Sequence, residues 1–126
     1  MRDLIHNIAA LPAIAPAVQS AAVDGAAMDL KGFNRVAFVI NTGAIAGSGD
    51  FGVKVQESDD GSAFTDAAAS AVLGAVPATL AATTAYKLGY VGFKQYARLS
   101  LTKAGGTSIA LSALAILGDP ASAPVT

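Results

Sequence analysis

Apolar and polar residues alternate along several stretches of the chain, and this period of two predicts β-strands. In residues 51–56, Phe51, Val53 and Val55 occupy every second position and polar or small residues fill the others. Side chains of a strand point alternately to its two faces, so such a stretch is half buried. Residues 58–62 then supply Asp and Gly, which tolerate the positive φ of tight turns, before residues 63–65 resume a strand. The pattern predicts a β-hairpin over residues 51–66.

Similar patterns predict further strands along the chain. Residues 96–102 alternate with Ala97, Leu99 and Leu101 facing inward, and residues 27–30, 35–41 and 108–117 also have strand character. Two glycines in residues 86–93 indicate a bulge or a tight hairpin. Residues 42–50 are expected to be a Gly-rich loop, and residues 104–107 a hairpin turn.

Short strands separated by Gly and Pro turns predict an all-β fold, an antiparallel β-sandwich or a jelly-roll-like barrel. Residues 66–82 are expected to contribute at most one short helix or an irregular excursion. The domain is expected to span residues 26–118. Residues 1–25 precede it as an extended N-terminal arm or as a first strand, and residues 119–126 follow as a flexible C-terminal tail.

The last predicted strand, residues 108–117, is apolar on both of its faces. A strand of this kind is buried on both sides, so Leu114 is expected to lie between the sheets or against another subunit. Only 13% of the residues are charged, against about 25% in an average soluble domain. We therefore expect an obligate homo-oligomer or a lattice.

Few residues are suited to catalysis or to metal binding. The chain has no cysteine and one histidine, His6, so thiolate sites are excluded and a catalytic triad is disfavoured. Glu57, Asp59 and Asp60 lack the alternating spacing of a calcium loop and indicate a solvated turn. Residues 47–52 match G-x-G-x-x-G, but a strand follows where a dinucleotide site needs a helix. We expect no enzymatic activity, no cofactor and no bound metal.

Charge limits the classes of partner. The formal net charge is −1, which argues against general binding of nucleic acid. Lys87, Lys94, Arg98 and Lys103 lie among tyrosines and are expected to form an outward sandwich face or an interface to an acidic partner. No apolar run approaches the roughly 20 residues of a membrane helix. A signal peptide is disfavoured because Pro12 and Pro16 interrupt the apolar segment.

Three segments resemble a group of small structural proteins of tailed bacteriophages and gene-transfer particles. They are AAMDLKGFNRVAFVINTG (26–43), FGVKVQESDDGSAFTDA (51–67) and YVGFKQYARLSLT (90–102), and the likeness covers most of residues 26–118. Members of this group are small, largely β, and look like head-decoration or other minor virion proteins. The resemblance implies a capsid decoration (cement) protein that binds the major capsid protein on the virion surface, and it implies no catalytic residue.

Two other functions remain open at this stage: a tail or head-completion protein of the same virion, and a secreted carbohydrate-binding β-sandwich module. The leading hypothesis takes the decoration protein to be a homotrimer. Contacts with the capsid or with other subunits are expected from three places. These are the N-terminal segment with Leu11, Ile14 and Val18, the last strand with Leu114 and Ile116, and the basic face around Lys87 to Lys103 with Lys94 and Arg98. The basic face is the second choice for attachment, after residues 1–22.

Overall fold

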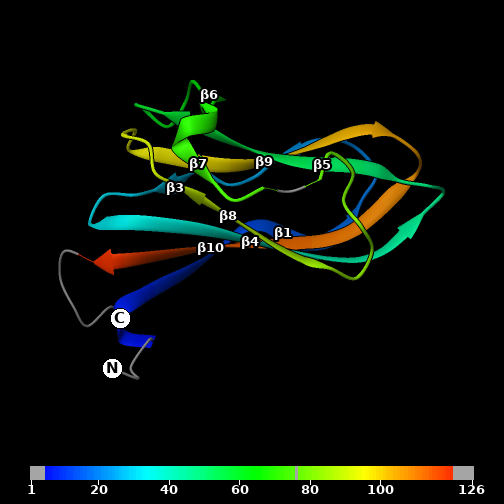
Figure 1. Cartoon of the computed structure of the whole chain (residues 1–126), viewed down its shortest axis with the longest axis horizontal. Helices are drawn as coiled ribbons and strands as arrows, with labels where there is room; N and C mark the ends of the chain where they lie inside the picture. The colour runs from blue at the N-terminus through cyan, green and yellow to red at the C-terminus, as the bar shows by residue number, and fades with distance from the viewer. Residues whose placement is uncertain (1–4, 76, 121–126) are drawn as a thin grey trace.

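Two antiparallel β-sheets lie face to face in the computed structural model, which describes residues 5–75 and 77–120 (Figure 1). The all-β sandwich prediction is confirmed. Helical structure in these residues is limited to two 3-10 turns, Ile5–Asn7 and Ala69–Ala71, the second within the stretch expected to be irregular. No helix in this part of the chain is long and apolar enough to cross a membrane.

Sheet A has five strands in the order β1-β10-β4-β8-β7. Their bounds are Ile8–Gln19 (β1), Ser108–Pro120 (β10), Phe33–Ala46 (β4), Ala85–Tyr90 (β8) and Val72–Leu73 (β7). Sheet B has the order β2-β9-β5-β6, with β3 also paired to β9. Its strands are Val23–Asp24 (β2), Met28–Asp29 (β3), Asp50–Ser58 (β5), Thr65–Asp66 (β6) and Tyr96–Gly105 (β9).

The core lies between the two sheets and is filled by the inward side chains of the long strands. Ala97, Leu99 and Leu101 on β9 are fully buried, as the alternation in that segment predicts. Phe38 and Ile40 on β4 face them from sheet A and are also fully buried. Burial of a large apolar side chain contributes about 1.5–3 kcal/mol, so these strands supply much of the stability.

The described part of the N-terminal segment forms the edge strand β1 instead of a free arm. It pairs with β10 from Ile8 to Gln19, and Ala13 and Ile14 are buried in the core. Register shifts occur between Pro12 and Ile14 and between Ile14 and Ala17, next to the two prolines. At the other end of the chain, β10 continues to Pro120, so the expected tail starts later than residue 119. The rest of the expected tail, residues 121–126, lies outside the described residues.

The hairpin predicted over residues 51–66 is present but short. Strands β5 and β6 pair through Gln56 with Asp66 and Glu57 with Thr65. Residues 63–64 belong to the turn, so the prediction that the second strand begins at residue 63 is wrong. The reason is that Asp60 Oδ1 accepts hydrogen bonds from Ser58, Ser62 and Ala63, which hold residues 58–63 in a wider turn than the sequence alone suggested.

Two other connections differ from the sequence-based predictions. Residues 42–46, expected in a loop, continue β4, and only Gly47–Gly49 turns. Residues 104–107 do not make a hairpin, because β9 belongs to sheet B and β10 to sheet A. Both the β4–β5 and the β9–β10 connections are therefore β-arches, which carry the chain from one sheet to the other.

The two arches lie at the same end of the sandwich, on the right in Figure 1, and contact each other through backbone. A Cβ added at Gly106 would meet the Ser48 carbonyl oxygen and the Gly49 Cα, and one at Gly49 would meet the Ser108 carbonyl oxygen. Gly106 also has a φ of 77°, in the left-handed region. Glycine is required here because any side chain would separate the arches.

Replacing Gly106 by Ala is expected to lower the free energy of unfolding by roughly 2 kcal/mol or more, because left-handed strain adds to a clash with backbone. Urea unfolding at neutral pH measures the change.

The matched control is Gly105→Ala at the neighbouring position. A Cβ at Gly105 would have no other atom within 4 Å, so the free energy of unfolding of this variant should lie within about 0.5 kcal/mol of the wild-type value. Equal destabilisation by the two substitutions would show that contact between the arches is not the reason for glycine at position 106.

Candidate functional site

The outward side of sheet A, called here the outer face, carries apolar side chains that remain accessible. Leu114 on β10 is 47% exposed and Leu73 on β7 is 58% exposed. Residues paired directly across an antiparallel ladder point to the same side of the sheet. The cross-strand neighbours of Leu114 and Ile116 on this face are also apolar: Ala10, Pro12, Ala37 and Val39.

The outer face explains why the last strand is apolar on both sides. Its residues Ile109, Leu111 and Leu117 face the core, whereas Leu114 faces outward. The expectation that Leu114 lies between the sheets is wrong, because Leu114 points to the outward side of sheet A, which no second sheet of the described residues covers. Burial against another subunit stays a prediction.

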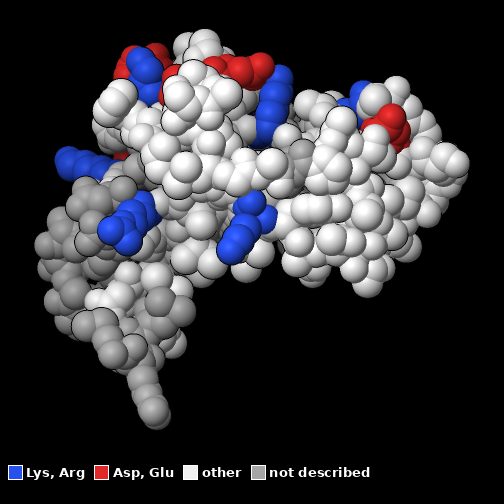
Figure 2. Space-filling model, viewed as in Figure 1, with Lys and Arg blue, Asp and Glu red and all other residues white. Residues whose placement is uncertain are grey.

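Charge is distributed unequally between the two sheets. The acidic side chains that the structure describes all lie on sheet B or in its loops: Asp24, Asp29, Asp50, Glu57, Asp59, Asp60 and Asp66. Among the described side chains, sheet A carries two charges, those of Arg35 and Lys87, and both are positive. Figure 2 shows carboxylates only in its upper half, where sheet B lies in the same view.

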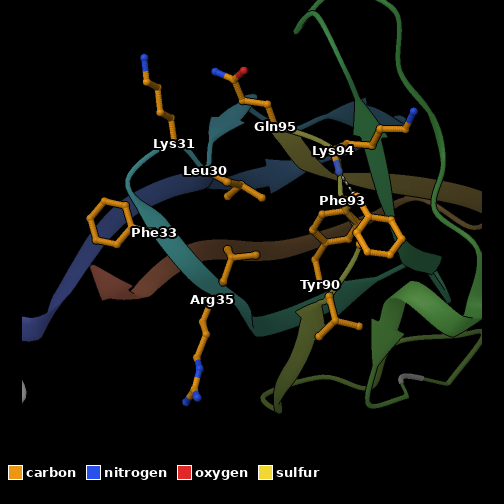
Figure 3. Close-up of a pocket in the computed structure, with 11 residues that line it drawn as sticks. Leu30, Lys31, Phe33, Arg35, Tyr90, Phe93, Lys94 and Gln95 are labelled. Atoms are coloured by element: carbon orange, nitrogen blue, oxygen red, sulfur yellow. Dashed lines mark hydrogen bonds between the residues drawn. The ribbon is translucent and has the colours of Figure 1, made fainter. Parts of the chain in front are cut away.

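Besides the outer face, a concave site, called here the end pocket, lies at the end of the sandwich away from the arches (Figures 1 and 3). Its volume is about 550 Å³. Two connections between the sheets form its walls: the turn at residues 30–32, which leads into β4, and the loop at residues 91–95 after β8. Phe93 in that loop is fully exposed, and Val91 is half exposed.

Tyr90, at the end of β8, anchors the loop that carries Phe93. Its hydroxyl donates to Glu57 Oε1 (2.7 Å) and accepts the backbone N–H of Lys94 (3.2 Å). Burial, followed by the hydrogen bond to Glu57, raises the pKa of Tyr90 to about 12. The phenol therefore stays protonated and keeps donating to Glu57 at neutral pH.

Further contacts fix both walls of the end pocket. A Cβ at Gly92 would meet the hydroxyl end of Tyr90, so the loop passes too close to that ring for any side chain. The backbone N–H of Leu30 donates to the Gln95 carbonyl oxygen (2.8 Å), which joins the two walls. Gln95 Nε2 also donates to Asp29 Oδ1 (3.0 Å). The pocket is thus formed before any ligand arrives.

The lining of the end pocket combines apolar and cationic groups and contains no carboxylate. Lys31, Arg35 and Lys94 supply the positive charge. Lys94 Nζ lies 2.7 Å from Asp59 Oδ2, and this contact raises the pKa of Lys94. No hydrogen bond or ion pair joins the Arg35 guanidinium to another described residue. Such a lining suits a ligand that is both anionic and apolar.

The seven contact residues expected from the sequence are found in different environments. Leu114 and Ile116 lie on the outer face, and Leu11 and Val18 are exposed on β1 (41% and 68%). Ile14 is 5% exposed and belongs to the core, because it pairs with the inward Ala113.

The two basic members of that set do not form one surface with the apolar ones. Lys94 lines the end pocket. Arg98 lies on β9, donates to Gln56 Oε1 (2.8 Å) and stacks over the Phe64 ring at 4.1 Å. The guanidinium of Arg98 therefore makes its contacts within sheet B and its loops. Arg35 and Leu73 had no distinguishing signal in the sequence, because only the fold brings them to these surfaces.

The acidic turn at residues 58–63 is held together by its own hydrogen bonds. Asp60 Oδ1 accepts the N–H groups of Ser62 (2.9 Å) and Ala63 (3.0 Å) and the Ser58 hydroxyl (2.9 Å). These bonds, the one from Ser62 first, lower the pKa of Asp60 to about 2. The carboxylate thus shapes the turn. Elsewhere too, the described residues contain no group of three His, Asp or Glu side chains placed to hold a metal ion.

Residues 47–52, which match the dinucleotide motif, form the β4–β5 arch and the start of β5. A strand follows them, so the helix N-terminus that binds a pyrophosphate in such motifs is replaced by extended backbone.

Neither the models of protein families nor the curated proteins include a match to this chain.

Asp60→Asn is expected to remain folded at neutral pH, because the amide oxygen can still accept hydrogen bonds. The pKa of Asp60 is lower in the folded protein than its ordinary value of 3.8, so the carboxylate stabilises the fold above pH 4. This advantage of the wild type over the variant should disappear as the pH falls from 4 to 2. Thermal melting across this range tests it, and a difference in melting temperature that is constant with pH would contradict it.

Leu114→Asp is expected to abolish self-association without unfolding the domain. Leu114 is already half exposed in the single chain, whereas a charge buried without a partner in an interface is strongly unfavourable. Sedimentation velocity at micromolar concentration should show an oligomer for the wild type and a monomer for the variant. Ala104→Asp adds the same charge at an exposed position of sheet B and should leave the oligomer intact. A monomeric wild type would refute the prediction.

Proposed function

We propose that this protein is a non-catalytic structural protein of a phage-like particle, a capsid decoration (cement) protein that binds the shell built from the major capsid protein and stabilises it. The observation that supports this most is the accessible apolar outer face of sheet A, with Leu114 and Leu73 about half exposed. A contiguous apolar patch that stays exposed on a small domain generally marks an interaction surface.

A protein on a shell needs contacts of two kinds. Copies of the chain meet one another around a symmetry axis, and the oligomer also meets a surface of different sequence. The outer face suits the first contact, because it is apolar and its two described charges leave most of it neutral. The end pocket suits the second contact. Its cations favour a partner of opposite charge, and its exposed Phe93 favours an apolar side chain on that partner. A trimer on the capsid surface is the assembly we favour.

One observation also supports the alternative of a carbohydrate-binding module. Phe93 presents a fully exposed aromatic ring at a concave site, and sugar rings stack on such side chains. Sugar hydroxyls, however, need acceptors as well as donors, and lysine and arginine only donate. Among the side chains that the structure describes, Gln95 is the single amide of the lining, so this lining offers a sugar few acceptors.

The number of copies per particle tests the proposed function. Particles purified from cells that carry the gene should contain this chain in hundreds of copies, about as many as the repeated contact sites of a shell require. Quantitative mass spectrometry against the major capsid protein gives the ratio. A ratio corresponding to one ring per particle would indicate a head-completion or tail protein instead, and absence from the particles would refute a virion role.

A further inference from the structure

We infer that the end pocket binds a short extended segment of a partner protein in which an aromatic or aliphatic side chain is flanked by carboxylates. This inference rests on the proposed function only in taking the partner to be a protein. It adds the chemistry of the segment that the protein recognises and the residues that recognise it.

The first argument is the display of Phe93. The ring is 102% exposed, yet the loop that carries it is held on both sides. The Lys94 N–H is bound by Tyr90, the Lys94 ammonium by Asp59, and Gly92 lies directly against the Tyr90 ring. Because the loop backbone is already held, binding has to order only the side-chain rotamer of Phe93, so burial of the ring against a ligand side chain is favourable.

The second argument is the placement of the cations. Figure 3 shows Lys31 and Arg35 pointing away from each other, on two sides of the pocket. Lys31 has the carboxylate of Asp29 close to it, whereas no ion pair joins Arg35 to any acidic side chain that the structure describes. A guanidinium binds a carboxylate through two parallel hydrogen bonds. Arg35 is therefore the stronger anchor for an acidic residue.

The third argument is the continuity of the pocket with the outer face. A groove of about 510 Å³ shares Arg35, Val36, Tyr90 and Val91 with the end pocket and continues past Leu73 and Ile116. Gly89 and Gly118 line this groove and leave its floor open. A segment several residues long can thus lie across both hollows, with Arg35 between them.

The charges of the molecule favour an acidic peptide over a nucleic acid. Asp29 and Asp59 lie beside Lys31 and Lys94, where they would repel a phosphate backbone. The overall charge of −1 gives no long-range attraction for a polyanion. A peptide with one or two carboxylates can meet Arg35 without approaching either aspartate.

A displayed library of random dodecapeptides, panned against the immobilised full-length protein, tests the inference. We expect enrichment of peptides that have Asp or Glu next to Phe, Leu, Ile or Val. Enrichment of peptides without acidic residues, or no enrichment at all, would overturn the inference. Stronger binding of a labelled single-stranded oligonucleotide or a soluble oligosaccharide than of the selected peptides would also overturn it.

Variants then locate the binding site of the most enriched peptide by fluorescence anisotropy. Phe93→Ala and Arg35→Gln should each weaken binding about tenfold, since each removes one anchor. Val18→Ala and Lys103→Gln remove an exposed apolar side chain and an exposed cation elsewhere, and both should bind as the wild type does. Unchanged binding by the first two variants, with normal melting curves, would place the site elsewhere.

The same variants separate this inference from the proposed function. If particles contain many copies of the wild type and equally many copies of Phe93→Ala and Arg35→Gln, the decoration role holds and the end pocket is not the attachment site. If the selected peptides bind through Phe93 and Arg35 but the chain is absent from particles, the inference about the end pocket is supported and the virion role is refuted.

Discussion

The close contact between the two β-arches is the constraint on which the arrangement of the long strands depends. Gly47–Gly49 and Gly105–Thr107 each carry the chain from one sheet to the other, and they can pass this closely because glycine leaves room for backbone. The arches fix where β5 and β10 begin, and the alternation of side chains then determines which residues face the core. The outward position of Leu114 follows from the same constraint, since a shift of one residue in β10 would exchange its two faces.

Much of the fold could be predicted from the sequence because its strands carry a clear period of two. The inward residues of β9 and the hairpin around Asp60 were identified in this way. The partners of the strands could not be predicted, because turn residues specify a local change of direction and not the sheet in which the next strand lies. The turn before β10 therefore looked like a hairpin, although β10 pairs with β1 and β4 in the other sheet.

The candidate surfaces could be predicted only in part. The two apolar sides of β10 indicated Leu114 and Ile116, but the pattern alone could not distinguish an outer face from a second core. Ile14 was expected at a contact surface, whereas its pairing with Ala113 turns it inward. The end pocket depends on residues distant in sequence, such as Arg35 and Phe93, and these meet only because β3–β4 and β8–β9 cross between the sheets at one end.

The prolines of β1 have a consequence for the growth of aggregates. An exposed edge strand offers unpaired N–H and C=O groups to which further chains can add, as in amyloid fibrils. Pro12 and Pro16 have no N–H, and the register shifts beside them distort the strand, so β1 is a poor template for another strand. In the assembly proposed above, copies would meet through the apolar face of sheet A while the prolines of β1 suppress the addition of strands at that edge, which favours closed assemblies over fibres.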